Sequence, residues 1–337
     1  MEVLVCLEPG QLALEQRPEP ERGASEVLVR VCRVGVCGTD YHIYEGTQPF
    51  LKYPRIMGHE LAVEVAEAPT GSAFKTGDLA IVNPYLSCGT CHACQKGKPN
   101  CCTRIAVLGV HRDGGMTEYI SVPESNLYPA VGLNADEAAA VEFLAIGAHG
   151  IGRAGMTAAG KTLIVGAGPI GIGAAIFAGL EGAAVTLMDR DGDRLVAAAE
   201  LTGAVATMVA GDRNSEAVSD ATGGDGFDTV IDATGSRASM EASFAYVAHG
   251  GAYVLLGLVR DSVTFSDPEF HKREMRLLAS RNALKSDFER VMAAIAAKKV
   301  PISRLITHRS TLVGAASDIA RWATDKRGLI KAMIEVS

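Results

Sequence analysis

Aromatic side chains are scarce in this chain: Phe, Trp and Tyr make up 5% of its 337 residues, and only one of them is a tryptophan. A pocket for a fatty or aromatic ligand is therefore not expected. No apolar run reaches the roughly 18 residues of a membrane-spanning helix, which argues against a membrane partner. The formal net charge of -7 disfavours nucleic acid as a partner. The acidic, strand-like start of the chain lacks the features of a targeting segment, so we expect a cytoplasmic protein.

The length and the hydrophobic content of 48% suffice for about two domains. Residues 1–144 contain short β-branched stretches bounded by Gly, Pro or Asp, which predict a small β-rich domain with long functional loops. Residues 145–283 alternate strand, glycine turn and helix, which indicates a doubly wound parallel sheet. Residues 284–337 are too few for an independent domain and are expected to return to the first one. The predicted fold class is α/β.

Short apolar stretches place the individual elements. Strands are expected at 26–31, 61–66 and 79–82 in the first region, and at 162–165, 184–188, 229–232, 252–256 and 276–280 in the second. Helices are expected at 194–201, 239–247, 287–298 and 314–324.

Four of the eight cysteines follow the spacing C-x2-C-x2-C-x7-C, at Cys88, Cys91, Cys94 and Cys102. Thiolates this close together can surround one tetrahedral Zn²⁺, and such a closed site staples a loop instead of binding substrate. Disulfides suit short secreted chains, whereas this chain is long and shows no export signal. We therefore predict a structural zinc. The spacing alone leaves Cys101 as an alternative to Cys102 for the fourth ligand.

A second motif, Gly166-Ala-Gly168-Pro-Ile-Gly171, lies between a predicted strand and a predicted helix. Its glycines allow a tight turn and let a dinucleotide pyrophosphate approach the helix N-terminus. Asp189, 18 residues after Gly171, can accept hydrogen bonds from the adenosine ribose and would repel a 2′-phosphate, so NAD is favoured over NADP. Either Arg190 or Arg194 could contact a 2′-phosphate, which keeps NADP open. The candidate nucleotide-binding residues are Gly166, Gly168, Pro169, Ile170, Gly171, Asp189, Arg190, Arg194, Thr234, Gly235, Leu256, Gly257 and Ser280.

Metal-capable side chains also occur outside the cysteine lobe, in Cys37-Gly-Thr39-Asp-Tyr-His42, in Gly58-His59-Glu60 and at Glu142. A thiolate, a neutral imidazole and a carboxylate or water suit a catalytic Zn²⁺ that keeps an exchangeable position. Each residue taken alone is equally consistent with an ordinary structural role. Their coexistence with a nucleotide motif and a zinc lobe favours a zinc-dependent, nucleotide-linked enzyme.

Taken in order, Cys37-Gly-Thr39-x-x-His42, Gly58-His59-Glu60, the four-cysteine lobe and the glycine motif resemble the zinc-dependent medium-chain dehydrogenases/reductases from end to end. The resemblance implies a GroES-like catalytic domain, a Rossmann NAD-binding domain, a homodimer or homotetramer, and one catalytic and one structural Zn²⁺ per subunit. It implies catalytic zinc bound by Cys37 and His59, with Glu60, Glu142 or water completing the sphere, and it favours Cys102 in the lobe. Polyol-type members usually read Glu-Pro where this chain reads Glu142-Phe143, so the fourth catalytic ligand stays open.

The resemblance also implies the reaction. Zinc lowers the pKa of the substrate hydroxyl, and the carbon-bound hydrogen leaves as hydride for the nicotinamide. Thr39 is the candidate that takes up the hydroxyl proton, and His42 is the candidate that passes it onward. A turn residue at Thr39 and an ordinary surface histidine at His42 are the alternatives.

Polar loops point to a hydroxyl-rich substrate. The stretches 44–58, 111–115 and 280–282 look most like sugar-acid members of the family, such as L-gulonate or L-galactonate 5-dehydrogenases, and their starvation-sensing relatives. We expect oxidation of a secondary hydroxyl of a sugar acid or polyol, with Arg112, Arg281 or Lys285 holding a carboxylate. The alternatives are L-threonine 3-dehydrogenase, another polyol or alcohol dehydrogenase, and a non-catalytic nucleotide-binding regulator. The presence of Cys37, Thr39 and His59 argues against the last.

Overall fold

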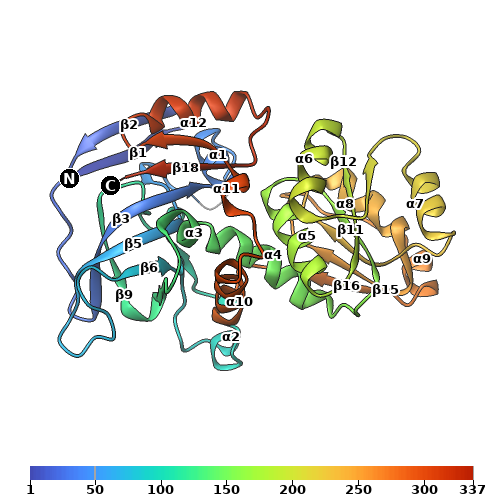
Figure 1. Cartoon of the computed structure of the whole chain (residues 1–337), viewed down its shortest axis with the longest axis horizontal. Helices are drawn as coiled ribbons and strands as arrows, with labels where there is room; N and C mark the ends of the chain where they lie inside the picture. The colour runs from blue at the N-terminus through green and yellow to red at the C-terminus, as the bar shows by residue number, and fades with distance from the viewer. Residues whose placement is uncertain (49–50, 337) are drawn as a thin grey trace. The chain divides into compact units, whose positions relative to one another are not determined.

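The computed structural model describes residues 1–48 and 51–336, and the chain divides into two compact units (Figure 1). The first unit combines Met1–Glu142 with Phe288–Ser337, and the second is Phe143–Asp287. The chain passes from one unit to the other within two helices, α4 (Val141–Ala154) and α10 (Lys285–Ala296). The boundaries expected from the sequence, after residues 144 and 283, lie a few residues from these points.

The first unit is built mainly from antiparallel strands. Its seven-stranded sheet has the order β10-β6-β5-β3-β18-β17, and β9 also pairs with β3. Because β18 (Lys331–Glu335) pairs with β3 (Glu26–Val36), the end of the chain completes a sheet begun near its start (Figure 1). The other strands are β1 (Glu2–Glu8), β2 (Gln11–Gln16), β4 (Arg55–Ile56), β5 (Glu60–Glu67), β6 (Leu79–Val82), β7 (Tyr85–Leu86), β8 (Ala106–Val107), β9 (Tyr119–Pro123), β10 (Leu127–Pro129) and β17 (Ile306–Thr311). The helices are α1 (Gly38–Tyr44), α2 (His92–Gln95), α3 (Ala135–Ala139), α11 (Ile302–Leu305) and α12 (Ala315–Thr324).

The second unit contains a six-stranded sheet in which all neighbouring strands are parallel, in the order β13-β12-β11-β14-β15-β16. Counted from β11, this is the 3-2-1-4-5-6 order of a Rossmann domain, and ligands bind such sheets where the order reverses, here between β11 and β14. The strands are β11 (Lys161–Val165), β12 (Ala184–Asp189), β13 (Ala206–Val209), β14 (Phe227–Asp232), β15 (Val247–Leu255) and β16 (Arg276–Ala279). The helices are α5 (Pro169–Leu180), α6 (Gly192–Thr202), α7 (Asn214–Thr222), α8 (Arg237–Ser243) and α9 (Asp267–Lys272).

The prediction of a helix at 239–247 is wrong for the second half of that range. Helix α8 ends at Ser243, a 3₁₀ turn covers Phe244–Tyr246, and Val247 begins β15. Phe244, Tyr246 and Val247 are all buried in the core of the second unit. Their apolar run fits the periodicity of a helix and of a buried strand equally well, and core packing decides between the two.

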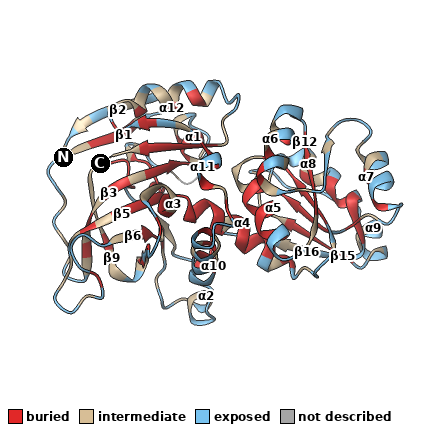
Figure 2. Cartoon of the chain, in the orientation of Figure 1, coloured by how far each residue is buried: buried red, intermediate tan, exposed pale blue. Residues whose placement is uncertain are grey.

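Burial follows the sheets in both units (Figure 2). The core of the first unit includes Val29, Leu61 and Trp322, and the core of the second includes Leu163, Val230 and Tyr253. Among the residues that the structure describes, no helix has the length and the apolar character needed to cross a bilayer.

Four charged side chains form a ring on the sheet of the first unit. Arg33 on β3 lies 3.1 Å from Asp136 on α3 and 3.5 Å from Glu335 on β18. Arg309 on β17 pairs with the same two carboxylates. The ring therefore joins residues 33, 136, 309 and 335, which local sequence patterns do not connect.

We expect Asp136→Asn to lower the stability of the fold at neutral pH by about 1 kcal/mol, since both arginines lose a partner. Hydrogen bonding to Arg309 holds the pKa of Asp136 below its ordinary value. The stabilisation is therefore present above the ordinary carboxyl pKa of about 4 and is lost as the pH falls through the lowered one. Thermal unfolding at a series of pH values should show wild type and variant differing at pH 7 and converging in acid. The exposed Asp220→Asn is the control, and a difference that persisted unchanged in acid would contradict the assignment.

Candidate active site and metal centres

The four cysteines of the predicted structural zinc site come together in a lobe of the first unit. The sulfur atoms of Cys88, Cys91, Cys94 and Cys102 all lie within 4.8 Å of one another. The lobe folds through the short helix α2 and a 3₁₀ turn at Pro99–Cys101, and Gly89 and Gly97 adopt positive φ angles of 70° and 71° at its bends. Cys101 is exposed and lies outside the group.

Backbone N–H groups point at the sulfurs of this lobe. The amide of Cys91 donates to the Cys88 Sγ at 3.4 Å, and the amides of Cys88 and Arg104 donate to the Cys102 Sγ at 3.3 Å each. Hydrogen bonding, led by the Thr90 backbone, lowers the pKa of Cys88 to about 5, and bonds led by the Cys94 backbone lower that of Cys91 to about 7. Desolvation raises the pKa of Cys94 to about 11. A group of four sulfurs, two of them favoured as thiolates, fits a Zn²⁺ ion.

A second group joins Cys37, His59 and Glu60, whose ligand atoms also lie within 4.8 Å of one another. Cys37 precedes α1 as its N-cap, His59 directly precedes β5, and Glu60 is the first residue of β5. The register of β3 with β5 pairs Gly35 with Glu60, which brings the two motifs together. A Cβ atom at Gly35 would lie 2.1 Å from the Glu60 carboxylate, so a larger residue there would displace this carboxylate from its present position.

The second group has the features of a cation site. His59 is buried, and its Nδ1 has no hydrogen-bond partner among the described residues. Burial opposes the charged form of His59, but Cys37 and Asp40 outweigh it and raise the pKa of the imidazole well above its ordinary value. A thiolate, an imidazole and carboxylates in one buried place form a donor set suited to Zn²⁺. The residues present therefore fit a catalytic zinc.

Glu60 also has a protein partner that local sequence patterns do not reveal. The Nζ of Lys331 lies 2.8 Å from both carboxylate oxygens of Glu60 and donates to the carbonyl of Val36 at 3.1 Å. Glu60 and Lys331 are 0% and 1% exposed, so this is a buried ion pair. Burial disfavours the charged lysine, but Glu60 more than compensates and keeps the Lys331 pKa above its ordinary value. The only sequence signal for Lys331 is the need of a buried glutamate for a cation.

Glu142 lies near this group but outside the set of three that could share one ion. It is the second residue of α4, it is buried, and it accepts a hydrogen bond from the hydroxyl of Tyr85. Burial raises the pKa of Glu142 to about 7. Tyr85 belongs to no recognisable motif, so its sequence context gives no sign of this contact.

Asp40, which was not among the residues predicted for the site, also lies beside Cys37 and His59. It is fully buried and accepts hydrogen bonds from the backbone amides of Cys37 at 2.9 Å and Gly58 at 3.3 Å. Its Oδ1 lies 4.0 Å from the Nδ1 of His59. Asp40 thus joins the two motifs that carry Cys37 and His59. Its place between Thr39 and His42 in the motif was the available signal.

The two residues of the expected proton path lie on α1. Thr39 is half-buried, and His42 is exposed, with its Nδ1 3.0 Å from the Thr47 hydroxyl. His42 also lies 3.5 Å from Glu45. Among the described residues, no hydrogen bond links Thr39 to His42 directly. Residues 49 and 50 of the stretch 44–58, which looked like sugar-acid members of the family, lie outside the described residues.

The glycine motif forms the turn between β11 and α5. Gly166 has a φ of 97°, and a Cβ atom at Gly171 would lie 1.8 Å from the carbonyl oxygen of Gly166. At Gly168 a Cβ would meet nothing within 4 Å, so the backbone is open there to an approaching group. Asp189 ends β12 and accepts hydrogen bonds from the amides of Ala167 at 2.7 Å and Asp191 at 3.0 Å. Asp189 is therefore hydrogen-bonded to the glycine turn through the amide of Ala167.

A cavity of about 280 Å³ opens beside this turn. Of the expected nucleotide-binding residues, those that line it are Gly166, Gly168, Asp189, Arg190, Arg194 and Thr234. Ser236 and Ser239, which the sequence analysis missed, line it as well. Pro169, Ile170 and Gly171 open helix α5, Gly235 follows Thr234, and Leu256, Gly257 and Ser280 follow β15 and β16, all outside the lining set. A cavity at the switch point of a Rossmann sheet fits the adenosine end of a dinucleotide.

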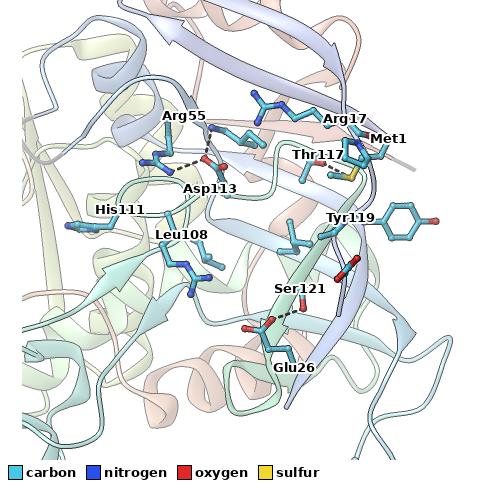
Figure 3. A pocket seen from close by; sticks show the side chains of 17 residues that line it. Met1, Arg17, Glu26, Arg55, Leu108, His111, Asp113, Thr117, Tyr119 and Ser121 are labelled. Atoms are coloured by element: carbon cyan, nitrogen blue, oxygen red, sulfur yellow. Dashed lines mark hydrogen bonds and ion pairs between the residues drawn. The ribbon is translucent and has the colours of Figure 1, made fainter. Parts of the chain in front are cut away.

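Arg112, one of three candidates for a substrate carboxylate, lines a different cavity. This cavity of about 650 Å³ lies in the first unit and is also lined by Arg17, Arg55 and Tyr119 (Figure 3). Figure 3 shows Arg55 paired with Asp113, 2.8 Å away. None of Cys37, His59, Glu60 and Glu142 lines this cavity, and Arg281 and Lys285 belong to the second unit.

Comparison with known proteins decides the family. A model of the alcohol dehydrogenase GroES-like domain matches residues 23–132, and a model of the zinc-binding dehydrogenase matches residues 169–297. The L-galactonate-5-dehydrogenase of Escherichia coli K12 is 40% identical over 336 residues, which cover 99% of this chain and 98% of that protein. The chain is a zinc-dependent medium-chain dehydrogenase/reductase. The expected family, the GroES-like and Rossmann folds and the dehydrogenase activity are thereby confirmed.

Other members of the family show the range of its activities and cofactors. The L-threonine 3-dehydrogenase of Bacillus velezensis is 32% identical over 312 residues, 89% of this dehydrogenase and 88% of that one. An alcohol dehydrogenase of Escherichia coli CFT073, solved with NADH, superposes with a TM-score of 0.92 at 29% identity, covering 100% of this chain and 99% of that one. A zinc-binding dehydrogenase of Sinorhizobium meliloti 1021, bound to NADP, gives 0.91 at 30% identity, with 99% of each chain covered.

Proposed function

We propose that this dehydrogenase uses NAD to oxidise a secondary hydroxyl of a sugar acid or polyol, with L-galactonate or L-gulonate as the favoured type of substrate. The likeness to an L-galactonate-5-dehydrogenase, 40% over 99% of the chain, carries the proposal. The scarcity of aromatic residues adds weak support, because aromatic side chains are common in pockets for apolar ligands.

Two zinc ions per chain belong to the proposal. Cys88, Cys91, Cys94 and Cys102 would hold the structural ion, and Cys37 and His59 the catalytic one, with Glu60, Glu142 or water completing its sphere. When bound, a catalytic zinc lowers the pKa of a hydroxyl that it contacts. The Thr39 hydroxyl would accept the substrate proton while passing its own proton onward, and the exposed ring of His42 would be a later station that releases a proton to solvent.

The choice of NAD rests on Asp189. Its carboxylate lies in the lining of the cavity beside the glycine turn, where the adenosine ribose of a dinucleotide would lie. Arg194 lies 3.8 Å from Asp189 and 3.7 Å from Asp191, so two acids share its charge. An acceptor-only group at this place favours ribose hydroxyls and disfavours a 2′-phosphate.

We expect Asp189→Asn to lower kcat/KM for NAD about tenfold and to narrow the preference over NADP, because a charged hydrogen bond to the ribose is lost and the repulsion of a 2′-phosphate disappears. Initial rates with both cofactors at a fixed substrate concentration measure this. Asp193→Asn, an exposed neighbour in the first turn of α6, is the matched control. An unchanged ratio of the two kcat/KM values would remove Asp189 as the determinant.

The proposal also includes a homodimer or homotetramer and a cytoplasmic location. Eight cysteines in a chain of this length suit metal ligands and free thiols in a reducing compartment. L-Threonine oxidation is the second candidate, because a threonine dehydrogenase aligns with 89% of the chain.

The test is NADH formation by the zinc-loaded protein with L-galactonate, L-gulonate, neutral polyols, L-threonine and simple alcohols, with NADP in parallel. Turnover of a sugar acid or polyol that is lost in Cys37→Ser supports the proposal. Turnover of threonine alone would replace the substrate and keep the dehydrogenase chemistry. A protein that binds NADH but oxidises nothing in the panel would contradict the assigned substrate class.

A further inference from the structure

Asp232 is a buried acid at the carboxyl end of the Rossmann sheet to which neither the glycine motif nor the zinc chemistry assigns a role. It is the last residue of β14, at the switch point of the sheet, and it is 0% exposed. No ion-pair partner of Asp232 lies among the described residues. Burial raises the pKa of Asp232, and the hydrogen bonds from Thr234 and Ser239 act in the opposite direction.

Both oxygens of this carboxylate accept hydrogen bonds from the wall of the nucleotide cavity. Oδ1 accepts from the Thr234 amide at 2.9 Å and from the Thr234 hydroxyl at 2.6 Å. Oδ2 accepts from the Ser239 hydroxyl at 2.7 Å. Thr234 and Ser239 line the cavity, whereas Asp232 lies behind them. The acid thus acts on the lining without facing the ligand.

The main chain of Asp232 holds a second segment of the same edge. Its carbonyl accepts hydrogen bonds from the amides of Leu256 and Gly257, at 2.9 Å each. A Cβ atom at Gly257 would lie 2.5 Å from the amide nitrogen of Gly235. The segments that follow β14 and β15 therefore approach each other too closely for a side chain at this position. Asp232 therefore ties both loops together.

The glycine turn packs against the residue that Asp232 holds. A Cβ atom at Gly166 would lie 3.1 Å from the Cγ2 of Thr234 and 3.2 Å from its backbone nitrogen. A side chain at Gly166 would crowd Thr234, so Thr234 lies close against the turn, and a shift of Thr234 away from it would open the wall of the cavity. The position of Thr234 thus sets the width of the crevice where the pyrophosphate would lie.

We propose that Asp232 is a positioning residue for the dinucleotide: its carboxylate holds Thr234 and Ser239 so that the cavity beside the glycine turn is formed before the cofactor binds. This rests on the proposed use of a nicotinamide dinucleotide. Three donors converge on the two oxygens of Asp232, and the negative charge of the carboxylate strengthens all three hydrogen bonds. An asparagine removes the charge and forces the Ser239 hydroxyl to accept instead of donate, and an apolar residue would leave all three donors unpaired.

The test compares NADH binding by wild type and Asp232→Asn, measured by fluorescence titration without substrate. We expect the Kd for NADH to rise at least tenfold and the KM for NAD to rise with it, while kcat at saturating NAD stays within about twofold, since the reacting groups are untouched. Asp228→Asn is the matched control. Asp228 lies on the same strand, is exposed, and also accepts a backbone amide, that of Lys161 at 2.8 Å, but it is outside the cavity lining. It should bind NADH as the wild type does.

Thr234→Val and Ser239→Ala test the same proposal if the Asp232→Asn protein does not fold. Each removes one hydroxyl donor to Asp232 and should raise the Kd severalfold, with an unfolding temperature close to that of the wild type. An unchanged Kd in Asp232→Asn, or in both hydroxyl variants if that protein does not fold, would overturn the positioning role. If the wild type binds NADPH instead of NADH, the Kd values of the wild type and the variants are compared with NADPH. Wild type that binds neither would overturn the proposed function itself, and the positioning role with it.

Discussion

Replacing Cys37 by serine is expected to lower kcat/KM by about a thousandfold and the zinc content from two ions per chain to one. Serine keeps the size of the side chain but removes the soft thiolate that zinc prefers. Removing the ion from a site where it polarises an oxygen costs several kcal/mol of transition-state stabilisation, and about 4 kcal/mol corresponds to a thousandfold in rate. Metal analysis of the purified protein and initial rates with NAD measure the two effects together.

Cys101→Ser is the matched control for this experiment. Cys101 is exposed and lies outside both groups of metal-capable residues, so its replacement should leave two zinc ions and full activity. Loss of zinc in Cys101→Ser would instead place it in the lobe. A Cys37→Ser protein that kept two ions and its activity would contradict the assignment of Cys37.

Motifs whose parts are close in the chain were the ones that the sequence could predict. Four cysteines within 15 residues, and three glycines within six, have few ways to fold without meeting. The structure brings the four sulfurs within 4.8 Å and forms the turn between β11 and α5. The strand predicted at 79–82 coincides with β6 because its apolar run is short and clearly bounded.

Partners that come from distant parts of the chain could not be predicted in this way. Lys331 reaches Glu60 across 271 residues, and Tyr85 reaches Glu142 across 57. Neither Lys331 nor Tyr85 has neighbours in sequence that signal its role, since the pairing of β18 with β3 places the lysine. Arg112 illustrates the same limit: its charge suggested a substrate contact, but only the fold shows which cavity it lines.

The buried pair of Glu60 and Lys331 gives the largest expected effect on stability. We expect Lys331→Met in the zinc-free protein to lower the free energy of unfolding by about 3–5 kcal/mol, because it leaves a carboxylate that is 0% exposed without its cation. Adding Glu60→Gln should restore most of that loss, since replacing both charges of a buried pair is close to neutral. Urea unfolding measures both variants. Lys326→Met, an exposed lysine, is the control and should cost little.

Urea unfolding of the zinc-loaded protein distinguishes Glu60 from Glu142 or water as the group that completes the zinc sphere. If Glu60 completes the zinc sphere, the ion supplies the missing positive charge in Lys331→Met, and the loss of stability becomes smaller when zinc is loaded. If Glu142 or water completes it, Glu60 gains no direct partner, and the loss stays closer to its zinc-free value. Glu142→Gln gives the reciprocal comparison, because its carboxylate is held by the Tyr85 hydroxyl and not by Lys331. A Lys331→Met protein as stable as the wild type without zinc would show that the buried pair contributes nothing, and Glu60 would then be free to serve the metal alone.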